Sequence, residues 1–107
     1  MVDPEFLRAL TRARDQIRAF HEKEREESWF TTRPDGTILG VKVTPVASAA
    51  VYVPGGRAQY PSTVLMDTIP AKVAGVPRVV MVTPPQKDGS LSAYTLAAAK
   101  LVGVDEV

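Results

Sequence analysis

The sequence predicts an α/β fold, with an N-terminal helix, a β-hairpin and then a partial Rossmann-like βαβα(β) unit built on a parallel sheet. Three patterns support this class: an apolar stripe with helical spacing, a Pro-Asp-Gly turn between two β-prone segments, and alternating strand and helix patterns in the second half. The 107 residues allow one domain at most. We expect a single partial domain, made of a helical arm (1–28), a hairpin (29–47) and an α/β half-domain (48–107).

The first predicted element is a helix over residues 3–27. Asp3 is a suitable N-cap, and Pro4 fits the first helical position. Apolar residues recur every three or four positions along one face, at Phe6, Leu10, Ala13, Ile17 and Phe20. The charged run from His21 to Ser28 is interpreted as the solvated end of this helix, with His21 as a surface or boundary residue and not a ligand.

A hairpin is predicted next. The segment RPDG at 33–36 favours a tight turn, because proline presets φ and glycine accepts a positive φ. The flanking segments 29–32 and 37–39 are typical strands. Gly40 is expected to form a bulge, and Trp29 to pack against the N-terminal helix.

The second half predicts strand, helix, strand and helix in turn. The strands are Ala49–Val53 and Arg78–Thr83, and the apolar run of the second indicates burial on both faces of a parallel sheet. The first helix spans Ser62–Ala74, where Pro70 is expected to kink or break it. The second begins at a Ser90 or Ser92 cap, runs through Leu101 and contains three consecutive alanines suited to close packing on the sheet.

The two helix ends repeat each other. Gly75-Val76 matches Gly103-Val104, and the first copy continues into the predicted core strand. The second copy reaches Val107 after the first residue or two of such a strand. Because an interrupted strand leaves its ladder partners unpaired, we expect the fold to be truncated there and the chain to be a piece of a longer protein.

Composition excludes several classes of function. A net charge of +1 gives no electrostatic case for nucleic acid or an anionic membrane as partner. No apolar run approaches the ~20 residues of a membrane span, and the start lacks a signal peptide, so a cytoplasmic location is expected. With one histidine and no cysteine, we expect neither an autonomous zinc site nor a Ser-His-Asp triad.

The stretch VYVPGGRAQYPSTVLM, from Val51 to Met66, raises the question of nucleotide binding. A strand that ends in glycines and leads into a helix is a common phosphate site in α/β proteins. However, the stretch matches neither G-x-G-x-x-G nor G-x-x-x-x-G-K-[ST]. A plain strand-to-helix turn, in which the glycines serve geometry alone, stays open as the alternative.

Residues Val51–Pro85, VYVPGGRAQYPSTVLMDTIPAKVAGVPRVVMVTPP, resemble the corresponding segment of histidinol dehydrogenase. The resemblance extends upstream through FHEKEREESWFTTRPDGTILGVKVTP and downstream through DGSLSAYTLAAAKLVGVDEV, so it covers nearly the whole chain. One departure is Ala50, where the family commonly has glycine.

The resemblance implies a cytoplasmic homodimer that requires NAD and zinc and oxidises L-histidinol through the aldehyde to L-histidine. The family's chains are several times longer, and their zinc ligands and catalytic Glu-His pair lie in later segments. We therefore expect no catalytic residue and no metal ligand in this chain, no tightly bound cofactor, and no activity from it alone. The YVPGG motif maps the cofactor contact onto Tyr52, with Pro54, Gly55 and Gly56 beside it.

Two other functions stay open. The chain is also compatible with a non-catalytic α/β module that self-associates through its helical stripe and an open sheet edge. The second open function is that of a stand-alone nucleotide-binding domain. The expected partners are a second copy, as a homodimer or strand-exchanged oligomer, and the remainder of the enzyme.

Overall fold

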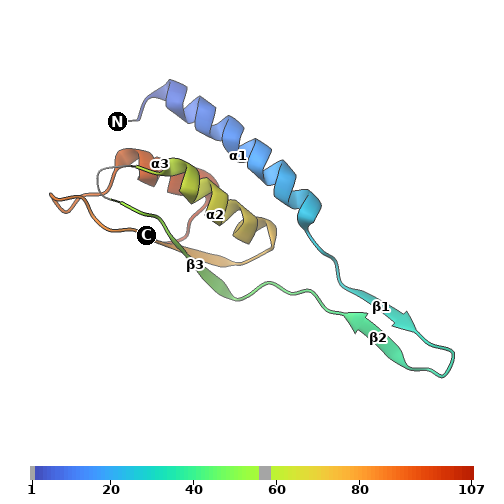
Figure 1. The fold of residues 1–107 in the computed structure, drawn as a ribbon. Helices are drawn as coiled ribbons and strands as arrows, with labels where there is room; N and C mark the ends of the chain where they lie inside the picture. The colour runs from blue at the N-terminus through green and yellow to red at the C-terminus, as the bar shows by residue number, and fades with distance from the viewer. Residues whose placement is uncertain (1, 56–58) are drawn as a thin grey trace.

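A computed structural model of the chain describes residues 2–55 and 59–107, and the description below concerns these residues (Figure 1). The elements follow the predicted order, so the α/β class and the βαβα unit are confirmed. Their bounds are α1 Pro4–Glu24, β1 Trp29–Thr32, β2 Ile38–Val41, β3 Ser48–Tyr52, α2 Pro61–Val73, β4 Arg78–Val82 and α3 Ala93–Val102.

The body of the molecule has three layers. Strands β3 and β4 pair in parallel, with Ser48 opposite Arg78 and Tyr52 opposite Val82. Helices α2 and α3 lie on one side of this sheet, and α1 lies across them as an outer layer (Figure 1). The core fills the space between sheet and helices, with its fully buried side chains at Val53, Val64, Leu65, Val79, Met81 and Ala98.

The sheet is buried on one face only, which corrects the expectation that β4 is covered on both. Val79 and Met81 point into the core, whereas Val80 is half-buried and Val82 is exposed. The reason is that all three helices lie on the same side of the sheet (Figure 1). The other face carries alternate side chains of both strands and has no helix over it in the described part of the chain.

Helix α1 begins as predicted but ends earlier. The Asp3 carboxylate accepts a hydrogen bond from the Glu5 amide at 2.9 Å, as an N-cap should. The helix ends at Glu24 rather than at residue 27, because Arg25 is already extended. Most of the apolar stripe packs on the core: Leu10 is buried, and the Phe6 ring meets Tyr94 edge-on at 4.8 Å. The last residue of the stripe, Phe20, is 65% exposed.

The hairpin forms at the predicted turn but projects from the body. The Gly36 amide donates to the Arg33 carbonyl at 3.0 Å, with φ of +88° at Gly36. The expected bulge is wrong: Gly40 pairs regularly with Phe30. A Cβ at Gly40 would collide with the Phe30 ring, which accounts for the glycine. Trp29 is 56% exposed on a hairpin that extends away from α1, so the expected packing on that helix is also wrong (Figure 1).

The helix ends in the second half differ slightly from the prediction. Pro70 lies inside α2, which continues three residues past it to Val73. Ser92, not Ser90, caps α3 by accepting a hydrogen bond from the Tyr94 amide at 3.2 Å. Gly75 and Gly103 end the two helices with positive φ, as their repeated positions predicted.

Residues 105 and 106 lie beside β4. The Met81 amide donates to the Glu106 carbonyl at 2.8 Å, and the Asp105 amide donates to the Val79 carbonyl at 2.9 Å. Val80 and Glu106 form a parallel bridge. These contacts place residues 105 and 106 in parallel beside β4, at the position that the repeated helix ends indicated.

The buried hydroxyl of Thr68 predicts a stabilising substitution. Thr68 is fully buried, and its Oγ1 has no hydrogen-bond partner among the described residues. Thr68→Val keeps the shape and removes the unsatisfied group, so we expect the free energy of unfolding to rise by about 1 kcal/mol. Urea denaturation measures this. Thr11→Val is the matched control, because the Thr11 hydroxyl donates to the Leu7 carbonyl at 2.8 Å, and no gain is expected there. An equal gain in both variants would contradict the prediction.

Asp105 predicts a pH dependence of stability. A hydrogen bond from the Val79 amide at 2.8 Å and then one from Lys72 Nζ at 3.0 Å lower the pKa of the Asp105 carboxyl below its usual 3.8. A lowered folded-state pKa contributes stability that is present above the unfolded value and is lost as the pH falls through the folded one. Asp105→Asn should therefore destabilise the chain at pH 7, and the difference from wild type should shrink below about pH 4. Urea midpoints across that range test this, and a pH-independent difference would contradict it.

Candidate functional site

The candidate site lies where the carboxyl ends of β3 and β4 meet. Parallel sheets bind ligands at this edge, because strands and following helices open a crevice there. Tyr52 and Val82 are register partners at the ends of the two strands. Tyr52 is 64% exposed and lies on the sheet face that α2 and α3 do not cover. Its ring is therefore available to stack on a planar group, and its hydroxyl to donate a hydrogen bond.

Gly55, which follows β3, is closely packed. A Cβ built on Gly55 would lie 2.9 Å from both the Cγ and the carbonyl oxygen of Pro84. Gly55 is therefore needed for the loops after β3 and β4 to touch, which supports the geometric alternative for this residue. Its role toward a cofactor, and that of Pro54, stays a prediction. Gly56 lies outside the described residues.

Little space is left between these two loops. The cavity bounded by Pro54, Gly55 and Pro84 has a volume of about 20 Å³. Ser92 helps to close it, since its hydroxyl donates to Gln59 Oε1 at 2.8 Å. This volume accommodates about one water molecule rather than a phosphate group. The space bounded by Pro54, Gly55 and Pro84 is therefore too small for a phosphate group.

The residues present do not fit a zinc ion. Across residues 2–55 and 59–107, no three His, Asp or Glu side chains gather in a group able to hold a metal. Asp88, near the candidate edge, is committed to its own turn: hydrogen bonds from the Ser90 hydroxyl and amide lower the pKa of its carboxyl. Its carboxylate stabilises the turn at residues 88–90.

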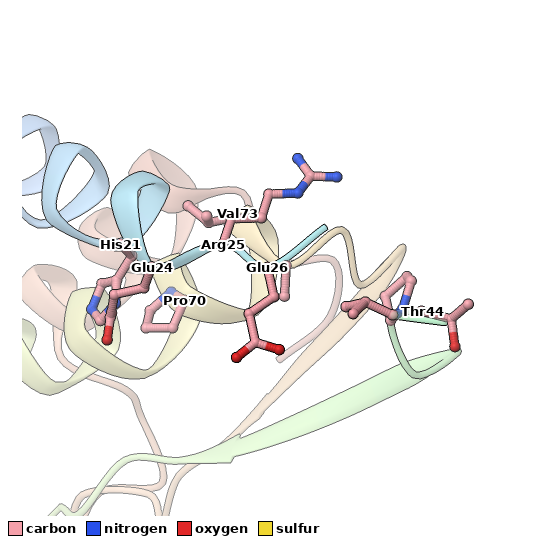
Figure 2. Close-up of a pocket in the computed structure, with 10 residues that line it drawn as sticks. His21, Glu24, Arg25, Glu26, Thr44, Pro70 and Val73 are labelled. Atoms are coloured by element: carbon pink, nitrogen blue, oxygen red, sulfur yellow. The ribbon is translucent and has the colours of Figure 1, made fainter. Parts of the chain in front are cut away.

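A second hollow, which the sequence did not indicate, lies at the other end of the sheet (Figure 2). Its volume is about 370 Å³, and it lies between the end of α1, the linker after β2 and the end of α2. His21 and Glu24 line one side as a hydrogen-bonded pair, the Glu26 carboxylate lies near the middle of the view, and Pro70 and Val73 form an apolar wall. The sequence favours a solvated helix end for the run from His21 to Ser28, whereas in the structure the helix ends at Glu24, and Arg25 and Glu26 line the hollow together with the end of α2.

Within the described residues, no helix is long and apolar enough to cross a membrane.

Comparison with known proteins identifies the family. The model of the family "Histidinol dehydrogenase" matches residues 1–107. The chain is 59% identical to histidinol dehydrogenase of Heliobacterium mobile over 106 residues and 53% identical to that of Bacillus subtilis (strain 168) over 106 residues, in both cases covering 99% of this chain. It spans about 25% of the length of these curated relatives.

A solved structure gives the same result. The crystal structure of histidinol dehydrogenase from Elizabethkingia anophelis superimposes with a TM-score of 0.91 at 31% sequence identity. The match covers 98% of this chain and 24% of that one. By sequence and by fold, the chain belongs to the histidinol dehydrogenase family.

Proposed function

We propose that this chain forms part of an NAD- and zinc-dependent histidinol dehydrogenase, an oxidoreductase that converts L-histidinol through the aldehyde to L-histidine. The observation that carries the proposal is the family match over residues 1–107. Because the chain spans about a quarter of its curated relatives, the complete activity is assigned to a longer polypeptide that contains this segment.

Within that enzyme we assign this segment one wall of the cofactor site. NAD, when bound, accepts the hydride removed from the alcohol and then from the aldehyde. Tyr52 supports an NAD contact because its ring is exposed at the carboxyl edge of a parallel sheet. The backbone near Gly55 holds the loop against Pro84 and so fixes the end of the strand that carries Tyr52.

The remaining chemistry is assigned to residues outside this segment. The chain has one histidine and no cysteine, and its described residues do not fit a zinc ion. We therefore expect the metal ligands and the acid–base groups to come from the remainder of the enzyme. The homodimeric state and the cytoplasmic location that the family resemblance implies stay predictions.

Substitution of Tyr52 in the longer enzyme tests the cofactor assignment. Loss of ring stacking in Tyr52→Ala should raise KM for NAD about tenfold, with a smaller effect on kcat and on KM for histidinol. Tyr52→Phe keeps the ring and should show a weaker effect. Met66→Ala is the control, because Met66 is similarly exposed, at 61%, on α2 away from the sheet edge. Equal KM values for NAD in wild type and Tyr52→Ala would refute the contact.

Turnover and NAD-binding assays on the 107-residue chain distinguish this proposal from its alternatives. Added to histidinol, NAD and zinc, the chain alone should produce no NADH. Measurable turnover would show that the catalytic groups lie within it. Saturable NAD binding at sub-millimolar concentration, followed by tyrosine fluorescence, would instead favour a stand-alone nucleotide-binding domain.

A further inference from the structure

The hollow beside His21 has the size and the walls of a small-molecule site (Figure 2). Its volume of about 370 Å³ lies within the range of about 300–1,000 Å³ that is usual for such sites. Half of its ten lining residues are apolar: Val43, Pro45, Pro70, Val73 and Ala74. These walls favour an occupant with an apolar part over a bare inorganic ion, and no group of metal ligands is found among the described residues.

The charged side chains at the hollow favour a cation. Its two acidic lining residues are Glu24 and Glu26. In Figure 2 the Glu26 carboxylate lies between the His21–Glu24 pair and Thr44, whereas the Arg25 guanidinium points to the opposite side of the backbone. Within residues 2–55 and 59–107, Glu26 takes part in none of the five ion pairs. Its negative charge is therefore available to an occupant.

Two helices end at the hollow, and their ends add to the negative potential. Helix α1 ends at Glu24, and α2 ends at Val73. The carbonyl groups at the C-terminal end of a helix together carry a partial charge of about −0.5. Arg25, which follows α1, is extended, so no left-handed cap covers the last carbonyl groups of that helix. The helix ends and the two carboxylates therefore favour the same sign of charge in the occupant.

We propose that this hollow binds an organic cation, an ammonium or guanidinium group on an apolar stem, with the charged end at Glu26 and the stem against Pro70 and Val73. A free alkylamine has this chemistry, and so does a lysine or arginine side chain from the remainder of a longer polypeptide. Titration of the chain and of the longer enzyme separates these two sources. The proposal does not depend on the cofactor contact assigned to Tyr52.

An NMR titration of the 107-residue chain with butylamine, at constant pH and ionic strength, tests the site. His21 is the only histidine, so its ring signals report directly on one wall of the hollow. We expect saturable shifts with a Kd of about 1–10 mM. Glu26→Gln removes a lining carboxylate and should weaken binding at least about fivefold. Glu27→Gln is the matched control, because it removes the same charge from a residue outside the lining, and it should stay within about twofold of wild type.

Two further probes separate the charge from the apolar stem. 1-Butanol keeps the stem without the charge, and ammonium chloride keeps the charge without the stem. Each should bind at least about fivefold more weakly than butylamine. Equal binding of 1-butanol and butylamine, equal binding in wild type and Glu26→Gln, or no saturable shift up to about 100 mM butylamine overturns the proposal. Far-UV circular dichroism checks that both variants keep the fold.

Ligand-observed NMR with the longer enzyme identifies the source of the cation. Butylamine binding that Glu26→Gln weakens there supports a free ligand. Binding by the 107-residue chain without binding by the enzyme supports a lysine or arginine side chain of the remainder as the occupant. Binding by the enzyme that Glu26→Gln leaves unchanged shows a different site and overturns the assignment to this hollow.

Discussion

The fold depends on the burial of one face of the β3–β4 sheet beneath α2 and α3. The alternate side chains of two short parallel strands, Val79 and Met81 on one and Val51 on the other, leave water only because the helices lie directly over them. Ala98 and Ala99 of α3 are buried without bulk, which lets that helix approach closely. Helix α1 adds a third layer through Phe6 and Leu10.

The β1–β2 hairpin differs from these elements, because none of its strand residues is buried in this core. Its register is set locally, by the turn at 33–36 and by the Phe30 ring lying over Gly40. Its side chains nevertheless stay exposed on both faces. The hairpin residues favour strand conformation, but they pack against no core in the described part of the chain. Tertiary contacts therefore add little to the stability of the hairpin.

At the candidate cofactor edge, buried and exposed residues of the same strands lie side by side. The strand ends are fixed by the core, while Tyr52 lies on the face that the helices leave open. For the glycine loop the sequence left open both a phosphate cradle and a plain turn, and in the structure Gly55 packs against Pro84. Close contact between loops is a structural requirement for glycine that needs no ligand. The structure therefore gives Gly55 a packing role, and the cofactor contact of Tyr52 stays a prediction.

The sequence by itself determined the class of the fold, the order of the elements and the family, because these depend on local patterns: the cap at Asp3, the turn at 33–36 and the YVPGG block. Only the tertiary structure decided which surfaces are covered. An apolar run such as RVVMV shows that its side chains favour burial. It does not show whether helices cover the second face of the sheet, so the run predicts a β4 that is covered on both faces. Trp29 was assigned to a helix that it does not reach, for the same reason. The hollow beside His21 forms from three segments distant in sequence, and only the packing of α1 on α2 brings them together.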